Sequence, residues 1–200
     1  MKYRICFTMV VIMMCMSSCI FTFYPLYSED KLSDMPGLEG SFQADMSGSE
    51  DSEVWTFTRD SKGIYQLMIT EGSKTGTLEI HVVRLGDEYF IDILPAEFES
   101  DRIPDFVLWN LMPVYTIAKL ESSGNNLKML FFDPAWLEEK LSSHKIRIAH
   151  EVRRQDGNTG DIEFILLTAR TGELQKFVEK YASYKEAYDD GTFLTRLTAR

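Results

Sequence analysis

A histidine and an aspartate face each other across one predicted β-hairpin of this chain. Gly86 and Asp87 separate two apolar segments and suit a two-residue hairpin turn. Pairing the segments outward from this turn places His81 directly opposite Asp92. A carboxylate beside an imidazole favours the protonated ring, so Asp92 would orient His81 and make it more basic. The pair is therefore a candidate for general-base chemistry in a hydrolase.

A structural role is the more frequent explanation for a single His–Asp contact. The local sequence places no serine or cysteine nucleophile beside the pair, and no spacing of ligands indicates a metal site. His144 at a predicted helix end and His150 in a predicted strand are weaker candidates still. We expect no catalytic residue, no metal and no cofactor, and keep His81 and Asp92 as a polar pair or a possible part of a ligand pocket.

Cys19 is the second residue with recognisable chemistry. Two basic residues precede an apolar run over 5–16, and two serines stand directly before Cys19. This is the order of a secretory signal peptide. The string "MSSC" resembles the lipobox of bacterial lipoproteins, which implies that the thiol is acylated, for example with palmitate, and that Cys19 becomes the first residue after cleavage. We predict a signal peptide over 1–18, then a lipidated cysteine and tether over 19–36.

An uncleaved membrane anchor is the alternative for this segment. The apolar residues continue beyond Cys19, so 5–27 is long enough to cross a hydrocarbon core of about 30 Å as a helix. Pro25 and the serines argue against such a helix. Several acyl chains on one residue would attach the protein stably, because each buried methylene contributes about 0.8 kcal/mol and one chain is marginal. We therefore favour cleavage and lipidation.

The predicted tether has the wrong composition for a flexible linker. Such linkers are rich in glycine, serine or proline, whereas residues 20–36 are rich in aromatic side chains. We expect Tyr24, Leu26 and Tyr27 to lie against the edge of the folded domain.

The charge of the mature chain excludes some partners. Cleavage removes Lys2 and Arg4, which leaves 19 basic against 31 acidic residues and a net charge of −12. Binding to nucleic acid needs a basic surface, and so does attraction to anionic lipid. We expect contact with the membrane through the lipid on Cys19 and no nucleic acid partner. By resemblance to enteric sorting signals, Ile20 in place of aspartate favours the outer membrane of a bacterial cell envelope.

Residues 37–200 are predicted to form one mainly β domain. Short apolar or alternating segments recur along the chain, separated by turn residues. The eight segments are 52–58, 64–70, 77–85, 88–95, 114–120, 127–132, 145–152 and 162–169, and 38–46 is a possible ninth. So many short antiparallel strands at regular spacing favour a meander that closes into a barrel, since closure removes exposed sheet edges.

Two helices interrupt this pattern. The first is expected near 134–143, with Asp133 as the N-cap and Pro134 in the first helical position. The second is expected near 172–188 at the C-terminal end. The apolar residues that should dock these helices are Trp136, Leu137 and Leu141 in the first and Leu174, Phe177, Val178 and Tyr181 in the second.

A family resemblance covers nearly the whole mature chain. The strings that carry it are "LEGSF", "HVVRLGDEYFIDILP", "MPVYTIAKL", "DPAWLEEKL" and "LLTARTGELQKFVEKYA". Together they resemble a group of uncharacterised bacterial lipoproteins with a lipocalin-like barrel. The resemblance implies a lipocalin-like β-barrel domain and an envelope location, and implies no reactive group.

Three functions follow from these features. The leading one is non-catalytic binding of an apolar or amphipathic small molecule in the barrel, with Phe106, Leu108, Trp109 and Met112 as a possible lid or as core. The second is a structural or protein-interaction lipoprotein with a filled barrel. The third is a hydrolase using His81. The protein partners and the oligomeric state stay open.

Overall fold

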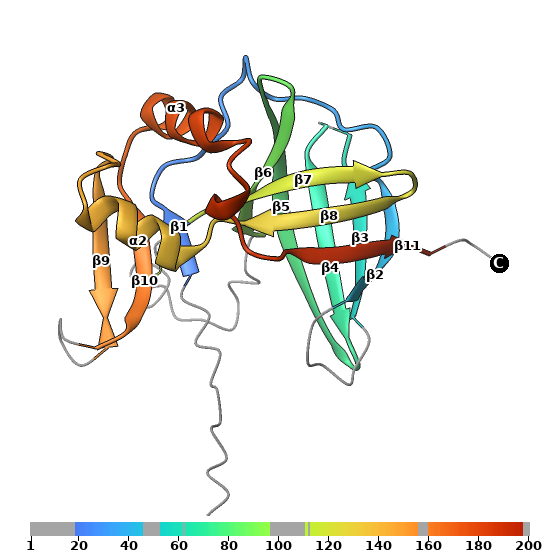
Figure 1. Cartoon of the computed structure of the whole chain (residues 1–200). Coiled ribbons are helices and arrows are strands. Elements are labelled where there is room, and N and C mark those ends of the chain that lie inside the picture. Colours follow the sequence, from blue (N-terminus) through green and yellow to red (C-terminus); the bar gives the residue numbers. More distant parts are fainter. Residues whose placement is uncertain are drawn as a thin grey trace, which may run out of the picture.

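An antiparallel barrel forms the larger part of the structure, a computed structural model that describes residues 19–45, 53–61, 63–96, 111, 113–155 and 160–197. Eight strands close in the order β11-β2-β3-β4-β5-β6-β7-β8 (Figure 1). They are β2 (Gly40–Asp45), β3 (Glu53–Arg59), β4 (Tyr65–Glu71), β5 (Lys74–Leu85), β6 (Glu88–Pro95), β7 (Thr116–Ser123), β8 (Asn126–Phe131) and β11 (Thr192–Arg196). The prediction of a mainly β chain that closes into a barrel is confirmed, and the barrel is compatible with a lipocalin-like one.

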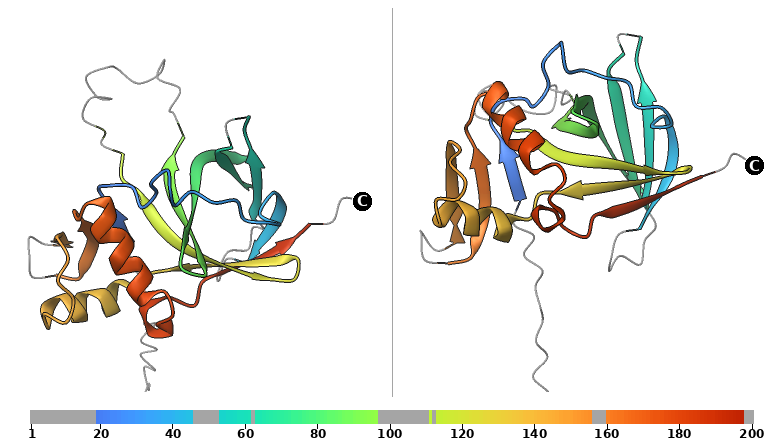
Figure 2. Two further views of the ribbon diagram at one scale, coloured as in Figure 1. Left: turned by 90° about the horizontal axis from the view of Figure 1, so that it is seen from above. Right: turned by 45° about the horizontal axis from the view of Figure 1, so that its top comes forward.

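A smaller layer lies beside the barrel (Figures 1 and 2). Its three-stranded sheet has the order β1-β10-β9, with β1 parallel to β10 and β9 antiparallel to it. The remaining elements are β1 (Cys19–Thr22), β9 (His150–Arg154), β10 (Ile162–Leu167), the helices α2 (Pro134–Ser142) and α3 (Thr171–Tyr181), and the 3-10 turn η3 (Lys185–Ala187). Within the described residues, neither α-helix is long and apolar enough to cross a membrane.

Two strand predictions need correction. The segments 145–152 and 162–169 were expected in the barrel, but β9 and β10 lie outside it, because β10 pairs with β1 instead of a barrel strand. The barrel is closed by β11, which pairs with β8 on one side and β2 on the other. That strand follows the C-terminal helix and was not predicted.

Side chains alternate between two apolar clusters across the barrel wall. In the β5–β6 hairpin, Val82 pairs with Ile91 and both belong to the cluster inside the barrel. Val83 pairs with Phe90, and both belong to the cluster between the barrel and the side layer. The barrel wall is therefore buried on both faces here, which explains the nearly continuous apolar sequence of these two strands.

Both helices dock as their apolar stripes predict. Trp136, Leu137, Leu141, Leu174, Phe177, Val178 and Tyr181 are all buried. Asp133 caps α2 by accepting hydrogen bonds from the backbone N–H groups of Ala135 and Trp136 at 2.7 and 3.0 Å. The second helix ends at Tyr181 and not near residue 188, because the chain must turn back through η3 to reach β11. The buried Lys119 donates to the carbonyl of Ala182 at 3.0 Å, which satisfies an acceptor at this helix end.

Residues 23–39, here called the strap, cross the outside of the barrel between β1 and β2 (Figure 1, blue). Leu26 is fully buried, which confirms that this segment packs on the domain. Further along, Ser33 N–H donates to the Val82 carbonyl at 3.0 Å. Met35 and Leu38 then enter the cluster inside the barrel. The region predicted as a tether is thus part of the folded body.

Gly191 lies directly before β11, and Gly191→Ala is expected to destabilise the protein by about 2–3 kcal/mol. Its φ is +73°, and an added Cβ would lie 2.7 Å from the Met129 carbonyl oxygen. Gly72→Ala is the matched control, because its φ is +57° but an added Cβ meets nothing within 4 Å. Chemical denaturation should show a clearly larger loss for Gly191→Ala. Equal losses would mean that only backbone strain matters at Gly191.

Candidate functional site

Side chains fill the central part of the barrel interior. Fully buried residues from strands all around the barrel meet there, and they are Phe42, Phe57, Leu67, Ile80, Ile91 and Met129. Met35 and Leu38 of the strap belong to the same cluster. An eight-stranded barrel is just wide enough for such packing. Space for a ligand therefore has to be sought at the ends and sides of the barrel.

One such space is the barrel-mouth pocket, with a volume of about 300 Å³. Its lining is Phe21, Trp55, Leu67, Leu78, Ile93, Leu94, Pro95, Val114, Thr116, Met129 and Phe131. The indole N–H of Trp55 donates to Glu53 at 2.9 Å and is already satisfied. Only the hydroxyl of Thr116 adds a second polar side-chain group to this lining. The pocket therefore suits an apolar group.

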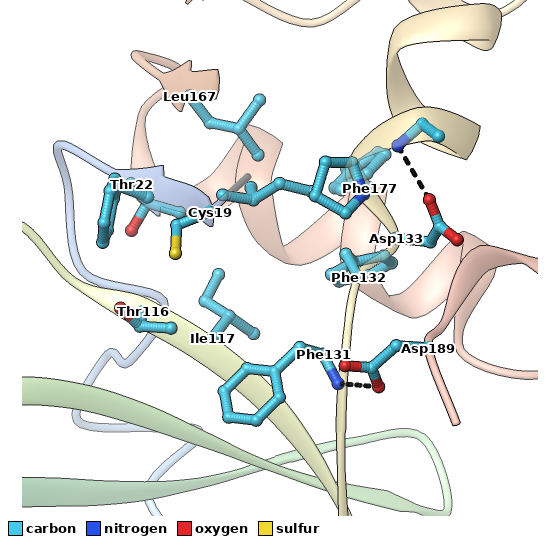
Figure 3. Close-up of a pocket in the computed structure, with 14 residues that line it drawn as sticks. Cys19, Thr22, Thr116, Ile117, Phe131, Phe132, Asp133, Leu167, Phe177 and Asp189 are labelled. Atoms are coloured by element: carbon cyan, nitrogen blue, oxygen red, sulfur yellow. Dashed lines mark hydrogen bonds between the residues drawn. The ribbon is translucent and has the colours of Figure 1, made fainter. Parts of the chain in front are cut away.

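A larger space, here called the side cleft, lies between the barrel and the side layer and measures about 530 Å³ (Figure 3). It is lined by Cys19, Ile20, Phe21, Thr22, Thr116, Ile117, Phe131, Phe132, Asp133, Pro134, Ala135, Leu167, Phe177 and Asp189. Phe21, Thr116 and Phe131 also line the barrel-mouth pocket. The two spaces are therefore neighbours, separated by shared side chains.

Both carboxylates and the Thr22 hydroxyl of the side cleft already have protein partners. Asp189 accepts hydrogen bonds from the backbone N–H groups of Phe131 and Gly191, both at 3.0 Å. Asp133 caps α2 in the same way. Thr22 donates its hydroxyl proton to the Tyr24 carbonyl at 2.9 Å. The cleft consequently presents an apolar surface, with no cationic side chain in its described lining.

His81 and Asp92 pair in register as predicted, but they form no hydrogen bond with each other. His81 Nδ1 and Asp92 Oδ1 are both buried and without a partner. Both side chains lie on the outer face of the barrel, on the same side as Val83. Asp92 Oδ2 instead accepts from the backbone N–H of Leu26 in the strap at 2.6 Å. The pair therefore holds the strap and does not line the barrel interior.

The strap decides the environment of His81. The Tyr27 ring stacks on the imidazole at 3.8 Å between centroids, with 10° between the planes. His81 Nε2 lies 3.4 Å from Glu79. Burial lowers the pKa of His81, and the charge of Glu79 offsets this only in part. The expected increase in basicity from Asp92 is not found, because burial raises the pKa of Asp92 to about 7 and so disfavours the charged carboxylate that would stabilise a protonated His81.

Burial is also the largest influence on the pKa of the Asp92 carboxyl. It raises the pKa of Asp92 to about 7, although the N–H groups of Leu26 and Tyr27 act in the opposite direction. Asp92 is completely inaccessible to solvent. A fully enclosed carboxyl that bonds to backbone is typical of a structural group, and no substrate can reach it without displacing the strap.

The other predicted site residues divide into two groups. Cys19 is exposed and lines the side cleft. The signal peptide 1–18 and the predicted lid residues Phe106, Leu108, Trp109 and Met112 lie outside the described residues. In the part of the chain that the structure describes, no group of three or more His, Cys, Asp or Glu residues is placed to hold a metal ion.

Sequence reasoning did not single out Phe21, Thr116 and Phe131, which join the two apolar spaces. The aromatic composition of residues 20–36 was the available signal, because it indicated packing. The composition could not indicate which part of the chain these residues pack against, since β1 pairs with a strand more than a hundred residues away.

The chain matches no family model, no curated protein and no solved structure. Its resemblance to bacterial lipoproteins stays a prediction from the sequence.

Proposed function

We propose that this protein is a lipid-anchored lipoprotein of the bacterial cell envelope that binds an apolar or amphipathic small molecule at the barrel mouth, without catalysis. The barrel-mouth pocket carries this proposal, because it is an open apolar space at the end of an otherwise filled barrel. A volume of about 300 Å³ lies at the lower limit of small-molecule sites, which span roughly 300–1,000 Å³. The ligand is therefore small, or only its apolar end enters.

Removal of apolar surface from water drives the binding. Each Å² of apolar surface that leaves water contributes about 25 cal/mol. Leu78 of β5, Ile93 of β6 and Trp55 of β3 belong to the lining of the pocket. These side chains are held by the closed sheet, so the site is formed before the ligand arrives and needs little ordering.

The anchor is the second half of the proposal. Cys19 is exposed at the start of β1, where a lipid on its thiol would not disturb the core. Residues 19–22 lie in a β-strand and so do not continue a membrane helix from the segment before them. Ile20 after the anchored residue favours the outer membrane. The mass of the N-terminal peptide of the full-length protein tests the anchor, since it should include acyl chains.

A protein-interaction lipoprotein is the second candidate function. The filled barrel interior favours it, because a barrel packed by Phe42, Phe57 and Met129 needs no ligand for stability. In that case the outer surface would bind a partner. A hydrolase has no support from the geometry, since His81 and Asp92 form no hydrogen bond with each other and are covered by the strap.

Native mass spectrometry tests ligand binding. All described elements lie between Cys19 and Arg196, so a secreted chain that starts at residue 19 with Cys19→Ser contains the whole described fold. Purified from a bacterial periplasm without detergent, it should carry an additional mass that organic extraction removes and that a medium-chain fatty acid restores. The start at residue 19 is needed because Phe21 lines the pocket.

Two variants locate the site. Leu78→Trp should fill the barrel-mouth pocket and weaken fatty acid binding roughly tenfold or more, a loss of about 1.4 kcal/mol. Met68→Trp is the matched control, because Met68 is 42 % exposed on the outer face of β4 and should leave binding unchanged. A protein without any additional mass, which also fails to bind fatty acid, would contradict ligand binding and favour the interaction lipoprotein.

A further inference from the structure

We propose that the side cleft holds one acyl chain of the protein's own lipid anchor, attached at Cys19. This inference rests on the proposed anchoring through Cys19 and extends it. It assigns an occupant to the larger of the two apolar spaces, leaving the barrel-mouth pocket for the separate ligand.

The position of Cys19 is the first argument. Cys19 belongs to the lining of the cleft, and Figure 3 shows its sulfur directed across the cleft towards Thr116 and Ile117. A lipid attached to this sulfur would begin inside the apolar space. No spacer separates the attachment point from the cleft.

The rigidity of β1 is the second argument. Cys19 pairs with Phe164 in the parallel ladder between β1 and β10. At the other end of β1, Thr22 and Tyr115 exchange two backbone hydrogen bonds of 2.8 and 2.9 Å. The strand is thus held by the side layer and by the chain that leads into β7. The anchored residue cannot move far from the cleft without breaking this pairing.

The chemistry of the lining selects the occupant. The carboxylates of Asp133 and Asp189 are bound to backbone N–H groups, so the described lining offers apolar surface and no cationic side chain. A separate fatty acid would bring a carboxylate close to two aspartates, and the described lining holds no cationic side chain to pair with it. An acyl chain bound through a neutral linkage at Cys19 brings no charge. Charge therefore favours the anchor over a free fatty acid.

Covalent attachment favours the same occupant. A group tethered next to its site binds as if present at an effective concentration in the millimolar range, without any additional contact. The shared residues Phe21, Thr116 and Phe131 place the barrel-mouth pocket at the end of the cleft.

Burial of one chain has a consequence for membrane attachment. Stable anchoring needs more than one acyl chain in the bilayer, since a single chain binds marginally and reversibly. An acyl chain held in the cleft does not enter the bilayer and does not contribute to anchoring. Blocking the cleft should therefore make the full-length protein harder to extract from membranes.

Photocross-linking of the full-length lipoprotein tests the inference. Cells that produce it are fed a fatty acid carrying a diazirine, which enters lipid anchors, and are then irradiated. After digestion with trypsin, the N-terminal peptide 19–31 should be joined through its lipid to a peptide from β7, α2 or α3. Mass spectrometry reads both the lipid on peptide 19–31 and the peptide to which it is joined.

Two variants make this test specific. Ala135→Trp places a large ring at the cleft from an exposed position of α2, so the fold should persist while the cross-link falls at least tenfold. Met68→Trp adds the same ring on the outer face of β4, which contributes no residue to the lining of the cleft, and should leave the cross-link unchanged. An equally strong cross-link in both variants would overturn the proposal.

The remaining outcomes separate the possible failures. Lipid joined to cleft peptides but not to peptide 19–31 would show that a separate lipid occupies the cleft. Cross-links from peptide 19–31 to bilayer lipid alone would show that every anchor chain stays in the membrane. Both results overturn this inference and leave the anchor intact. Peptide 19–31 without any lipid would overturn the anchor as well.

Discussion

Leu26→Ala is expected to lower the free energy of unfolding by about 2–5 kcal/mol, the usual range for a buried leucine. The Leu26 side chain is 0 % exposed and belongs to the cluster between the barrel and the side layer. Its backbone is also fixed on both sides. The N–H donates to Asp92, and the carbonyl accepts from the side-chain amide of Gln175 in α3 at 2.8 Å. The strap therefore cannot move to fill the cavity.

Leu32→Ala is the matched control in the same segment. The Leu32 side chain is 45 % exposed, so its truncation should change the free energy of unfolding by no more than about 0.5 kcal/mol. Urea denaturation of the secreted chain that starts at residue 19 measures both. A small effect of Leu26→Ala would show that the strap is loosely attached and that residues 23–39 behave as a tether.

A firmly packed strap changes the expected distance between body and membrane. If the anchor is at Cys19, the folded body begins at the anchored residue itself, because β1 starts there. The side cleft and the barrel mouth then both lie next to the membrane surface. This placement suits ligands that partition into lipid. The net charge of −12 expected for the mature chain would meanwhile repel the rest of the body from anionic headgroups.

Local rules predicted several parts of this structure. The register of the β5–β6 hairpin follows from Gly86 and Asp87 alone, and the pairing of His81 with Asp92 is as expected. The start of α2 follows from Asp133 and Pro134. In each case the residues that decide the geometry are within a few positions of one another, so a turn or cap rule is sufficient.

Parts that depend on distant pairing could not be predicted. The five residues of β11 follow a helix and carry no pattern that assigns them to a barrel. They form a strand because they pair with the edges of both β8 and β2. The parallel ladder between β1 and β10 pairs residues 19–22 with residues 164–167, more than a hundred positions later. The state of Asp92 depends on the strap, which the hairpin sequence does not reveal. Both apolar spaces are bounded by these same distant contacts.

Asp92 is expected to make the protein less stable as pH rises through about 7. Burial raises its folded-state pKa to about 7 from an ordinary 3.8. Between these values the folded state keeps a proton that the unfolded state has lost. The stability gained from this proton is complete below pH 3.8 and is lost as pH rises through about 7. The difference between these two pKa values corresponds to a change in the free energy of unfolding on the order of 4 kcal/mol.

His81 acts in the opposite direction, and so a variant must isolate Asp92. Burial lowers the pKa of His81, so its contribution is present above the ordinary histidine pKa of 6.5 and is lost as pH falls. Asp92→Asn removes the titration of Asp92 and leaves that of His81. The free energy of unfolding of Asp92→Asn minus that of the wild type should therefore rise between pH 4 and 7 by a few kcal/mol, then stay level.

Urea denaturation at a series of pH values measures this difference. Asp87→Asn is the control from the same hairpin, because the Asp87 side chain is fully exposed and its curve should run nearly parallel to that of the wild type. If the Asp92→Asn difference is also independent of pH, the Asp92 carboxyl must titrate near its ordinary pKa. That result would mean that water reaches it and that the strap opens at Leu26. A difference that rises with pH would show that the strap seals this carboxyl from water. The loss of stability caused by Asp92 is then largest above pH 7, where the buried carboxyl is an anion.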